Sequence, residues 1–337
     1  MSNRIFFFDL LRFVAAIAVV AIHALGPYRH LLGEIPTPEW IAAVGLNSLS
    51  RWAVPVFIMI TGALMLSDKR PFDPVTFFKR RLGKVLVPFL VWSLFYAWFS
   101  GWSISGYAAQ TSTQVLLEFF SHPTYYHLGF FYYFLPLYFV VPVFKWLMAN
   151  YDHKALAAYA GLWLLTTTLF LFKIDGPWSH ELWLYAGYLL LGWYLYHVEL
   201  TKRLMQGFVA AGIIAAIVTV MMVIEPSLAL QEYKVGRWLS YKTINTIVIV
   251  AAIFIAARYF APRLSEASKQ VVSFVSQYSL GVYLLHPIFL WPMIELEWYR
   301  LLPAWLSIPL WTLVAGSAAL WLSWVLAKSS KTRWLTP

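Results

Sequence analysis

Long apolar runs, separated by short polar segments, occupy most of this chain. A helix needs about 20 apolar residues to cross the hydrocarbon core of a bilayer, and by that measure the sequence predicts ten spans. They lie near residues 4–26, 46–66, 85–103, 127–149, 155–173, 182–199, 207–225, 239–260, 274–294 and 303–327. We therefore predict an all-α, polytopic membrane protein of about ten transmembrane helices, with residues 1–337 forming a single transmembrane domain.

The composition agrees with this reading of the pattern. Hydrophobic residues make up 61% of the 337 residues and charged residues only 12%, whereas a soluble domain carries about a quarter charged residues. The absence of cysteine excludes disulfides, thiolate nucleophiles and cysteine metal sites. The first apolar run, residues 5–26, is long enough to span a membrane and no signal-peptidase-like site follows it, so we do not expect it to be cleaved.

The charge distribution predicts an orientation. The chain has a net charge of +10, and its lysines and arginines fall mainly in short segments between apolar runs. With ten spans, most of them lie on the same side as the N-terminus, so the positive-inside rule places both termini in the cytoplasm. Because the positive charges follow the topology, we expect membrane lipids rather than nucleic acid as partners.

Three ionisable residues fall inside the first predicted span, where charge is costly. Asp9 and Arg12 are close enough on a helix to form an ion pair. Arg12 and His23 are separated by eleven positions, which brings them within about 20° of one helix face with a rise of about 16 Å. Either the pair is purely structural and His23 caps the helix at the interface, or Arg12 and His23 line one functional path.

Two further histidines share the predicted depth of His23. His127 begins the fourth predicted span on its outer side, and His286 lies toward the outer end of the ninth. Histidine suits proton transfer near neutral pH, and three histidines at one depth favour a site over three unrelated helix ends. Three histidines can also bind zinc, but no two of these share ligand spacing within a helix, so we expect no metal.

Basic residues suggest two more binding positions. Arg80, Arg81 and Lys84 lie in the cytoplasmic segment 67–84, before the third predicted span. They either anchor the membrane edge or hold a phosphorylated ligand that enters from the cytoplasm. Arg51 lies at the outer end of the second predicted span, where it snorkels to the interface or faces an outer cavity.

Four of these segments resemble motifs of the acyltransferase-3 membrane acyltransferases, particularly the stand-alone bacterial members that O-acetylate surface polysaccharide. The resemblance covers essentially the whole length. It rests on Asp9-Leu10-Leu11-Arg12 followed by His23, on Arg51 through Gly62 (RWAVPVFIMITG), on Tyr126-His127-Leu128, and on Ser279 through His286.

The chain departs from the family pattern at two places. Members often have two arginines three apart after the second helix, where this chain has Arg81 and Lys84. Lysine keeps the charge but loses bidentate geometry toward phosphate. Members often have tryptophan after His-Leu, where this chain has Gly129, which leaves the width of the outer pocket open.

The resemblance implies a bacterial inner-membrane O-acetyltransferase that uses cytoplasmic acetyl-CoA as donor. Arg80, Arg81 and Lys84 would hold the CoA head, and the pantetheine arm would rise past Arg12 toward His23. His23 would then act as general base for an acceptor hydroxyl, or would carry the acyl group transiently.

The acceptor implied by the resemblance is a cell-surface glycan or a lipid-linked sugar on the outer side. We assign His286 to catalysis with His23, and the substrate-binding role to Arg51, Tyr126, His127 and Tyr283, with Asp9 as the structural partner of Arg12. A secondary transporter or flippase of a lipid-linked sugar is the alternative, and a non-catalytic scaffold is a third. The sequence leaves open the acceptor, the acyl length and whether the chain forms a homo-oligomer.

Overall fold

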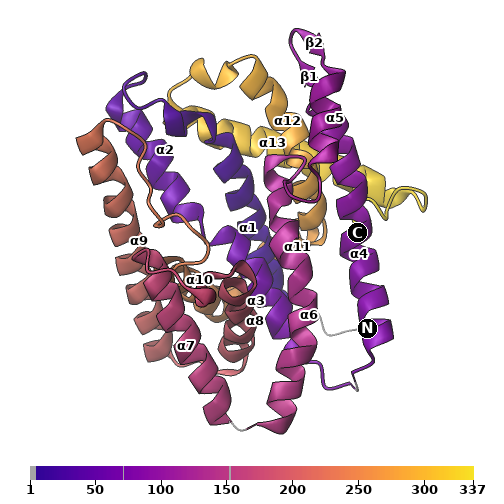
Figure 1. Ribbon diagram of the computed structural model, residues 1–337, viewed down its shortest axis with the longest axis vertical. Coiled ribbons are helices and arrows are strands. Elements are labelled where there is room, and N and C mark those ends of the chain that lie inside the picture. Colours follow the sequence, from indigo (N-terminus) through magenta and orange to yellow (C-terminus); the bar gives the residue numbers. More distant parts are fainter. Residues whose placement is uncertain (1–4, 71, 152) are drawn as a thin grey trace. The chain divides into compact units, whose positions relative to one another are not determined.

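The computed structural model describes residues 5–70, 72–151 and 153–337, and its regular structure is almost entirely helical (Figure 1). The helices are α1 Phe6–Ala24, α2 Thr37–Ser50, α3 Ala53–Leu66, α4 Pro74–Phe99, α5 Ala109–Leu117, α6 Gly129–Asn150, α7 His153–Leu171, α8 Glu181–His197, α9 Lys202–Leu230, α10 Ile244–Phe260, α11 Glu266–Gln277, α12 Ser279–Glu295 and α13 Ala304–Lys328. Five 3-10 turns connect them: η1 Pro27–His30, η2 Tyr126–Leu128, η3 Pro177–Ser179, η4 Ala261–Arg263 and η5 Trp298–Arg300. Strands β1 Trp102–Ser103 and β2 Gly106–Tyr107 form one small antiparallel hairpin.

Eight helices of the described residues are long and apolar enough to cross a membrane, with α2 and α3 counted as one span. Helices α11 and α12 add a ninth if the bent pair is one span. The remaining predicted span, 182–199, corresponds to α8, which has 17 residues and a length of about 26 Å against a hydrocarbon core of about 30 Å. The predicted all-α, polytopic architecture is confirmed.

Helix α4 begins earlier than predicted, at Pro74 instead of residue 85. Asp73 caps it: the carboxylate accepts hydrogen bonds from the backbone N–H groups of Val75 and Thr76 at 3.3 and 3.2 Å, which satisfies donors that the first turn leaves open. The hydrogen bonds to Thr76 lower the pKa of Asp73. The predicted loop 67–84 is therefore helical over its second half, and that half bears Lys79, Arg80, Arg81 and Lys84.

The predicted span 274–294 is also two helices instead of one. Helix α11 ends at Gln277, α12 begins at Ser279, and the two axes differ by 69°. The sequence suggests a single span because both helices are apolar near the junction. Helix α11 packs against α1, and both belong to the same compact unit of the chain.

The chain contacts divide into two compact units. The first unit consists of Met1–Lys69 with Val140–Gln277, and the second consists of Arg70–Phe139 with Tyr278–Pro337. Within the first unit, α3 packs against α8 and α9 packs against α10 (Figure 1). Within the second, α12 packs against α13 and α4 packs against α5.

Glycines bring α3 and α8 into backbone contact. A Cβ atom added at Gly192 would lie 2.1 Å from the carbonyl oxygen of Met59, and one added at Gly62 would lie 2.0 Å from that of Leu189. Small residues of this kind let two helices approach closely where lipid offers no hydrophobic driving force between them. Both carbonyls belong to the helix backbone, which cannot move aside as a side chain can, so an added Cβ would force the two helices apart.

We expect Gly192→Ala to destabilise the protein by about 3 kcal/mol or more, the upper end of the range for overpacking a tight contact. The measurement is the melting temperature of the purified protein in detergent. The matched control is Gly161→Ala on α7, because a Cβ there meets nothing within 4 Å and alanine favours a helix by about 1 kcal/mol. Equal melting temperatures for the two variants would contradict the packing argument.

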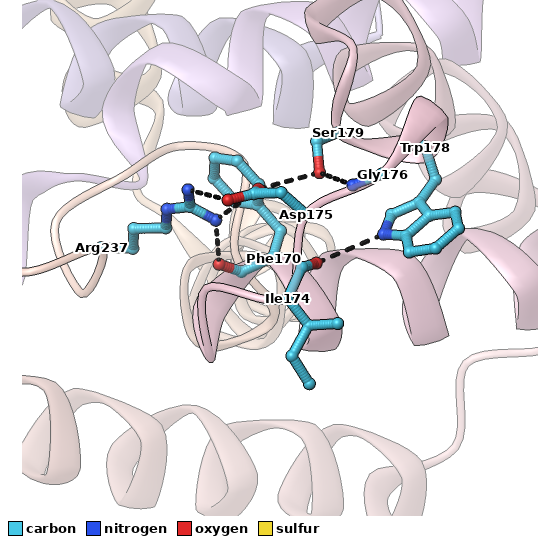
Figure 2. Close-up of polar contacts among 7 residues, drawn as sticks. All are labelled: Phe170, Ile174, Asp175, Gly176, Trp178, Ser179 and Arg237. Atoms are coloured by element: carbon cyan, nitrogen blue, oxygen red, sulfur yellow. Dashed lines mark hydrogen bonds and ion pairs between the residues drawn. The ribbon is translucent and has the colours of Figure 1, made fainter.

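An ion pair fixes the segment between α9 and α10 to the end of α7 (Figure 2). The Arg237 guanidinium donates to both carboxylate oxygens of Asp175 at 2.8 and 2.7 Å and to the carbonyl of Phe170 at 2.8 Å. It also stacks on the Phe170 ring at 4.0 Å, and the Ser179 hydroxyl donates to Asp175. The hydrogen bond from Arg237 lowers the pKa of Asp175. Segment 231–243 is thus anchored, which sets the position of the tyrosines it carries.

Candidate functional site

Helix α1 holds a buried carboxylate that fixes Arg12. Asp9 is 2% exposed, and its Oδ1 accepts a hydrogen bond from the Ser276 hydroxyl of α11 at 2.8 Å. The same oxygen forms the ion pair with Arg12 at 3.3 Å, while the Arg12 side chain stays 29% exposed. Burying a carboxylate costs free energy unless donors compensate, and the two donors do so here. Arg12 is therefore positioned by a buried partner while its guanidinium remains partly accessible.

His23 lies in the last turn of the same continuous helix and is half-buried. The chain turns sharply after it: the Gly26 N–H donates to the His23 carbonyl at 3.1 Å. A Cβ at Gly26 would lie 3.0 Å from that carbonyl and 3.3 Å from the Arg29 guanidinium, so a larger residue would crowd the turn. Asp9, Arg12 and His23 thus lie along one rigid element, with about 16 Å of rise between the last two.

The second unit brings His127 and His286 together. Their ring centroids are 5.6 Å apart and the rings are nearly perpendicular. Both are buried, with exposures of 2% and 0%. The Tyr283 hydroxyl of α12 donates to the His127 carbonyl, which holds turn η2 against α12. The sequence suggested this neighbourhood by depth alone, and the structure supplies the contact.

The hydrogen bond of His286 defines its tautomer. Its Nδ1 lies 3.1 Å from the Val282 carbonyl oxygen, and since a carbonyl only accepts, Nδ1 is the protonated nitrogen. In the neutral ring, Nε2 then carries the lone pair. The next residue, Pro287, has no N–H for the helix ladder. His286 therefore has a buried Nε2 with a lone pair, in the turn of α12 that Pro287 deprives of one backbone hydrogen bond.

His127 lacks such support. Within the part of the chain that the structure describes, neither of its ring nitrogens has a hydrogen-bond partner. The Leu284 carbonyl, which accepts a hydrogen bond from the Tyr96 hydroxyl at 2.6 Å, is the backbone group nearest to the imidazole, but its approach to the ring falls outside hydrogen-bond geometry. Native proteins pair most buried polar groups, so an unpaired one calls for a reason.

Tyrosines surround His127. The Tyr96 ring meets the imidazole edge-on at 4.7 Å and stacks on Tyr125 at 4.8 Å. Tyr125 precedes the spanning segment, and burial, with a further contribution from the negative charge of Glu295, raises its pKa to about 12. Tyr283 is 8% exposed and Tyr126 is 45% exposed. The tyrosines around His127 thus offer neutral, hydrogen-bonding hydroxyls beside apolar rings, which suits a polyhydroxylated ligand.

The three basic residues before the third predicted span lie on α4. Arg80 and Lys84 are exposed and Arg81 is half-buried, near the Tyr138 hydroxyl. Spacings of three and four bring Lys84 onto the same helix face as both arginines. Among the described residues, none of the three forms an ion pair with a carboxylate. The face is a concentrated positive charge that a phosphate could neutralise.

Arg51 lies at the junction of α2 and α3, within residues 37–66, which together are long and apolar enough to cross a membrane. Its guanidinium donates to the Tyr241 hydroxyl at 3.1 Å and lies 5.4 Å from the Tyr241 ring. The predicted span began at residue 46 because residues 46–66 already supply about 20 residues, although the apolar run continues back to Trp40. Arg51 therefore lies well inside the helical part of the first unit.

Several contacting residues were not singled out from the sequence. Ser276 holds Asp9, Tyr96 packs on His127, and Tyr241 holds Arg51. Tyr96 had a usable signal, a tyrosine deep within an apolar run. Ser276 and Tyr241 had none, because each partner lies far away in the sequence.

No group of three or more histidine, aspartate or glutamate side chains that could hold a metal ion occurs among the described residues. A family model described as an acyltransferase domain matches residues 5–328. The match extends from α1 to α13 and includes residues of both units. Neither a curated protein nor a solved structure matches the chain significantly.

Proposed function

The chain belongs to the acyltransferase-3 family of membrane acyltransferases, and we propose that it transfers an acetyl group from acetyl-CoA to a hydroxyl of a cell-surface carbohydrate. The observation that carries the proposal is the arrangement on α1: Arg12 is fixed by buried Asp9 on the helix whose last turn contains His23. A cation and a titratable base on one rigid element suit a long, thin thioester substrate.

The proposed chemistry is a direct acyl transfer. His23 takes the proton of the acceptor hydroxyl as its oxygen attacks the thioester carbonyl. The carbon–sulfur bond breaks, the acetyl group forms an ester with the acceptor, and the proton passes to the departing sulfur to give free CoA. A transient acyl-histidine is the two-step version of the same transfer. In the second unit, His286 presents a lone pair on Nε2 and is the further base that we propose, with His127, Tyr126 and Tyr283 contacting the sugar.

The donor would be held by the basic face of α4. CoA carries a diphosphate and a 3′-phosphate, and the positive charges of Arg80, Arg81 and Lys84 match these groups. Arg81 is the half-buried member and so has the most favourable setting for a directional hydrogen bond.

We expect Arg81→Ala to weaken acetyl-CoA binding at least tenfold, since a hydrogen bond to a charged group contributes about 1.5–3 kcal/mol. Isothermal titration of the purified protein with acetyl-CoA measures this. The control is Lys331→Ala, which removes an exposed cation of the same unit that lies after α13. Unchanged affinity in Arg81→Ala would show that the basic face serves only to anchor the protein.

The proposed sidedness, with both termini in the cytoplasm of a bacterial inner membrane, is open to a labelling test. The sequence has no cysteine, so each single-cysteine variant has one reactive thiol. Five helices that we count as membrane crossings separate Lys79 from Lys234: α4, α6, α7, α8 and α9. Helix α5, with nine residues, is too short to cross. In intact cells, an impermeant maleimide is expected to label Lys234→Cys but not Lys79→Cys, and to label both after permeabilisation. If both variants are labelled, or both are protected, in intact cells, the two residues lie on the same side, and α8 does not cross the membrane.

The acceptor class is tested in cells. We expect surface polysaccharide from a strain lacking this chain to lose an acetyl mass increment, measured by mass spectrometry, and the wild-type gene to restore it. Identical acetylation in the deletion strain would contradict the proposed acceptor while leaving the acyltransferase activity itself untouched.

A further inference from the structure

Two arginines of the first unit lie near each other. Arg29 belongs to turn η1, after α1, and Arg51 joins α2 to α3. Arg29 lies outside the spanning helices, and its pKa is lowered, first by burial and further by the positive charge of Arg51, while Tyr233 and Tyr241 act in the opposite direction. The fold has thus placed two partly buried guanidiniums within electrostatic reach of each other, which is unfavourable unless something negative compensates.

No carboxylate supplied by the described residues compensates for them. The contacts of Arg29 are with the Gly26 carbonyl at 3.2 Å and with Tyr233, and Arg51 donates to the Tyr241 hydroxyl. Other cations nearby are neutralised: Arg237 and Lys242 pair with Asp175 and Glu181 at 2.7 and 2.8 Å. In this neighbourhood, Arg29 and Arg51 are the cations without a carboxylate partner among the described residues.

The same neighbourhood contains unused hydrogen-bonding groups. Among the described residues, buried Nε of Arg51 and buried Oδ1 of Asn47 have no partner, although Asn47 is fully buried and its Nδ2 donates to the Tyr233 hydroxyl at 3.0 Å. An unpaired buried group costs about 1–3 kcal/mol. Arginine N–H groups form a fork that fits an oxyanion, and a free amide oxygen accepts a hydrogen bond from a hydroxyl. The arginines and the Asn47 amide together therefore suit a ligand that carries an oxyanion and a hydroxyl.

The groups around this position are held in place by the protein itself. The Tyr188 hydroxyl of α8 donates to the Tyr241 carbonyl at 2.6 Å, and the Asn245 amide donates to the Trp238 carbonyl at 2.8 Å. The Arg237–Asp175 pair fixes the same segment (Figure 2). A site that is rigid before it binds loses little conformational entropy on binding.

We propose that Arg29 and Arg51, with Asn47, Tyr233 and Tyr241, form a binding site for a phosphate or carboxylate group borne by a hydroxylated ligand. Resting on the proposed function, this assigns the acceptor to a chemical class: an anionic carbohydrate, either a sugar phosphate or a sugar acid. The guanidiniums hold the anionic group, and the Asn47 amide oxygen accepts a hydrogen bond from a hydroxyl of the same ligand.

The test is titration of the full-length purified protein with inorganic phosphate, glucuronate and glucose at constant ionic strength. We expect saturable binding of phosphate, glucuronate or both, and none of glucose. Arg29→Gln and Arg51→Gln should each raise the Kd at least tenfold. The matched control is Lys234→Gln, which removes an exposed cation from the same segment as Tyr233 and Tyr241, and its Kd should equal that of the wild type.

The outcomes separate the possibilities. Binding of phosphate alone assigns a sugar phosphate, and binding of glucuronate alone or of both probes extends the site to sugar acids. Wild-type protein that binds neither probe overturns the proposal, as does equal affinity in Arg51→Gln and wild type. If Arg51→Gln fails to fold, Tyr241→Phe removes one hydroxyl and should raise the Kd several-fold. Acetyl-CoA binding is titrated separately, so its absence would contradict the proposed function and leave the oxyanion result standing.

Discussion

Replacing His23 with alanine is expected to reduce acetyl transfer by about 10²–10⁴-fold, the range for losing a general base, without preventing membrane insertion. The side chain lies at the end of α1, half-buried, and α1 is fixed at its other end by the Asp9, Arg12 and Ser276 contacts. Removing the imidazole therefore leaves the helix and its anchor intact while removing the proposed proton acceptor.

The measurement is transfer of radiolabelled acetyl from acetyl-CoA to the acceptor by purified protein, alongside acetyl-CoA affinity and melting temperature. His197→Ala is the matched control, because His197 is an exposed histidine at the end of α8 in the same unit. His23→Ala should retain acetyl-CoA binding and stability. A wild-type transfer rate in this variant would remove His23 from the mechanism.

The length of apolar runs predicted most of the fold. Hydrocarbon demands apolar residues only over the width it covers, so helix that extends beyond it is invisible to the same criterion. This explains the early start of α4, whose first turns include Lys79, Arg80 and Arg81. Helix α2 is a different case: after Thr37, Pro38 and Glu39 it is apolar, and the predicted span 46–66 omitted it because that span already had about 20 residues. The sequence treated these stretches as loops, although both are helical.

The candidate site also contains residues that could be predicted from the sequence and residues that could not. Residues expected at one depth, such as His127 and His286, could be grouped from topology, and they are in contact. Partners joined across the chain could not: Ser276 and Asp9 are 267 positions apart, and Tyr241 and Arg51 are 190 apart. A single sequence contains no signal that pairs a hydroxyl with a distant charge, because many serines and tyrosines are equally suitable. The oxyanion site depends wholly on such pairings.

A second large effect is expected on replacing His127: the protein should become more stable while its acetyl transfer becomes slower. Its imidazole is buried, and neither ring nitrogen is paired within the described residues, a situation that costs about 1–3 kcal/mol. Replacing it with leucine, of similar size, removes that cost. We therefore expect His127→Leu to raise the melting temperature by a few degrees and to lower acetyl transfer by about tenfold, the effect of losing one hydrogen bond to the sugar of about 1.5 kcal/mol.

The two readouts together separate a functional histidine from a packing one. If the imidazole serves only for packing, the leucine variant should keep both the activity and the stability of the wild type. If the imidazole is kept unpaired for its chemistry, the variant should lose activity while its stability rises. His122→Leu is the control, since His122 is exposed in the same unit and its Nδ1 forms a hydrogen bond with the neighbouring Ser121 hydroxyl. His127→Leu with full activity would make the His127–His286 contact structural. Lower stability together with lower activity would mean that the imidazole is paired after all, so the loss of activity would follow from misfolding.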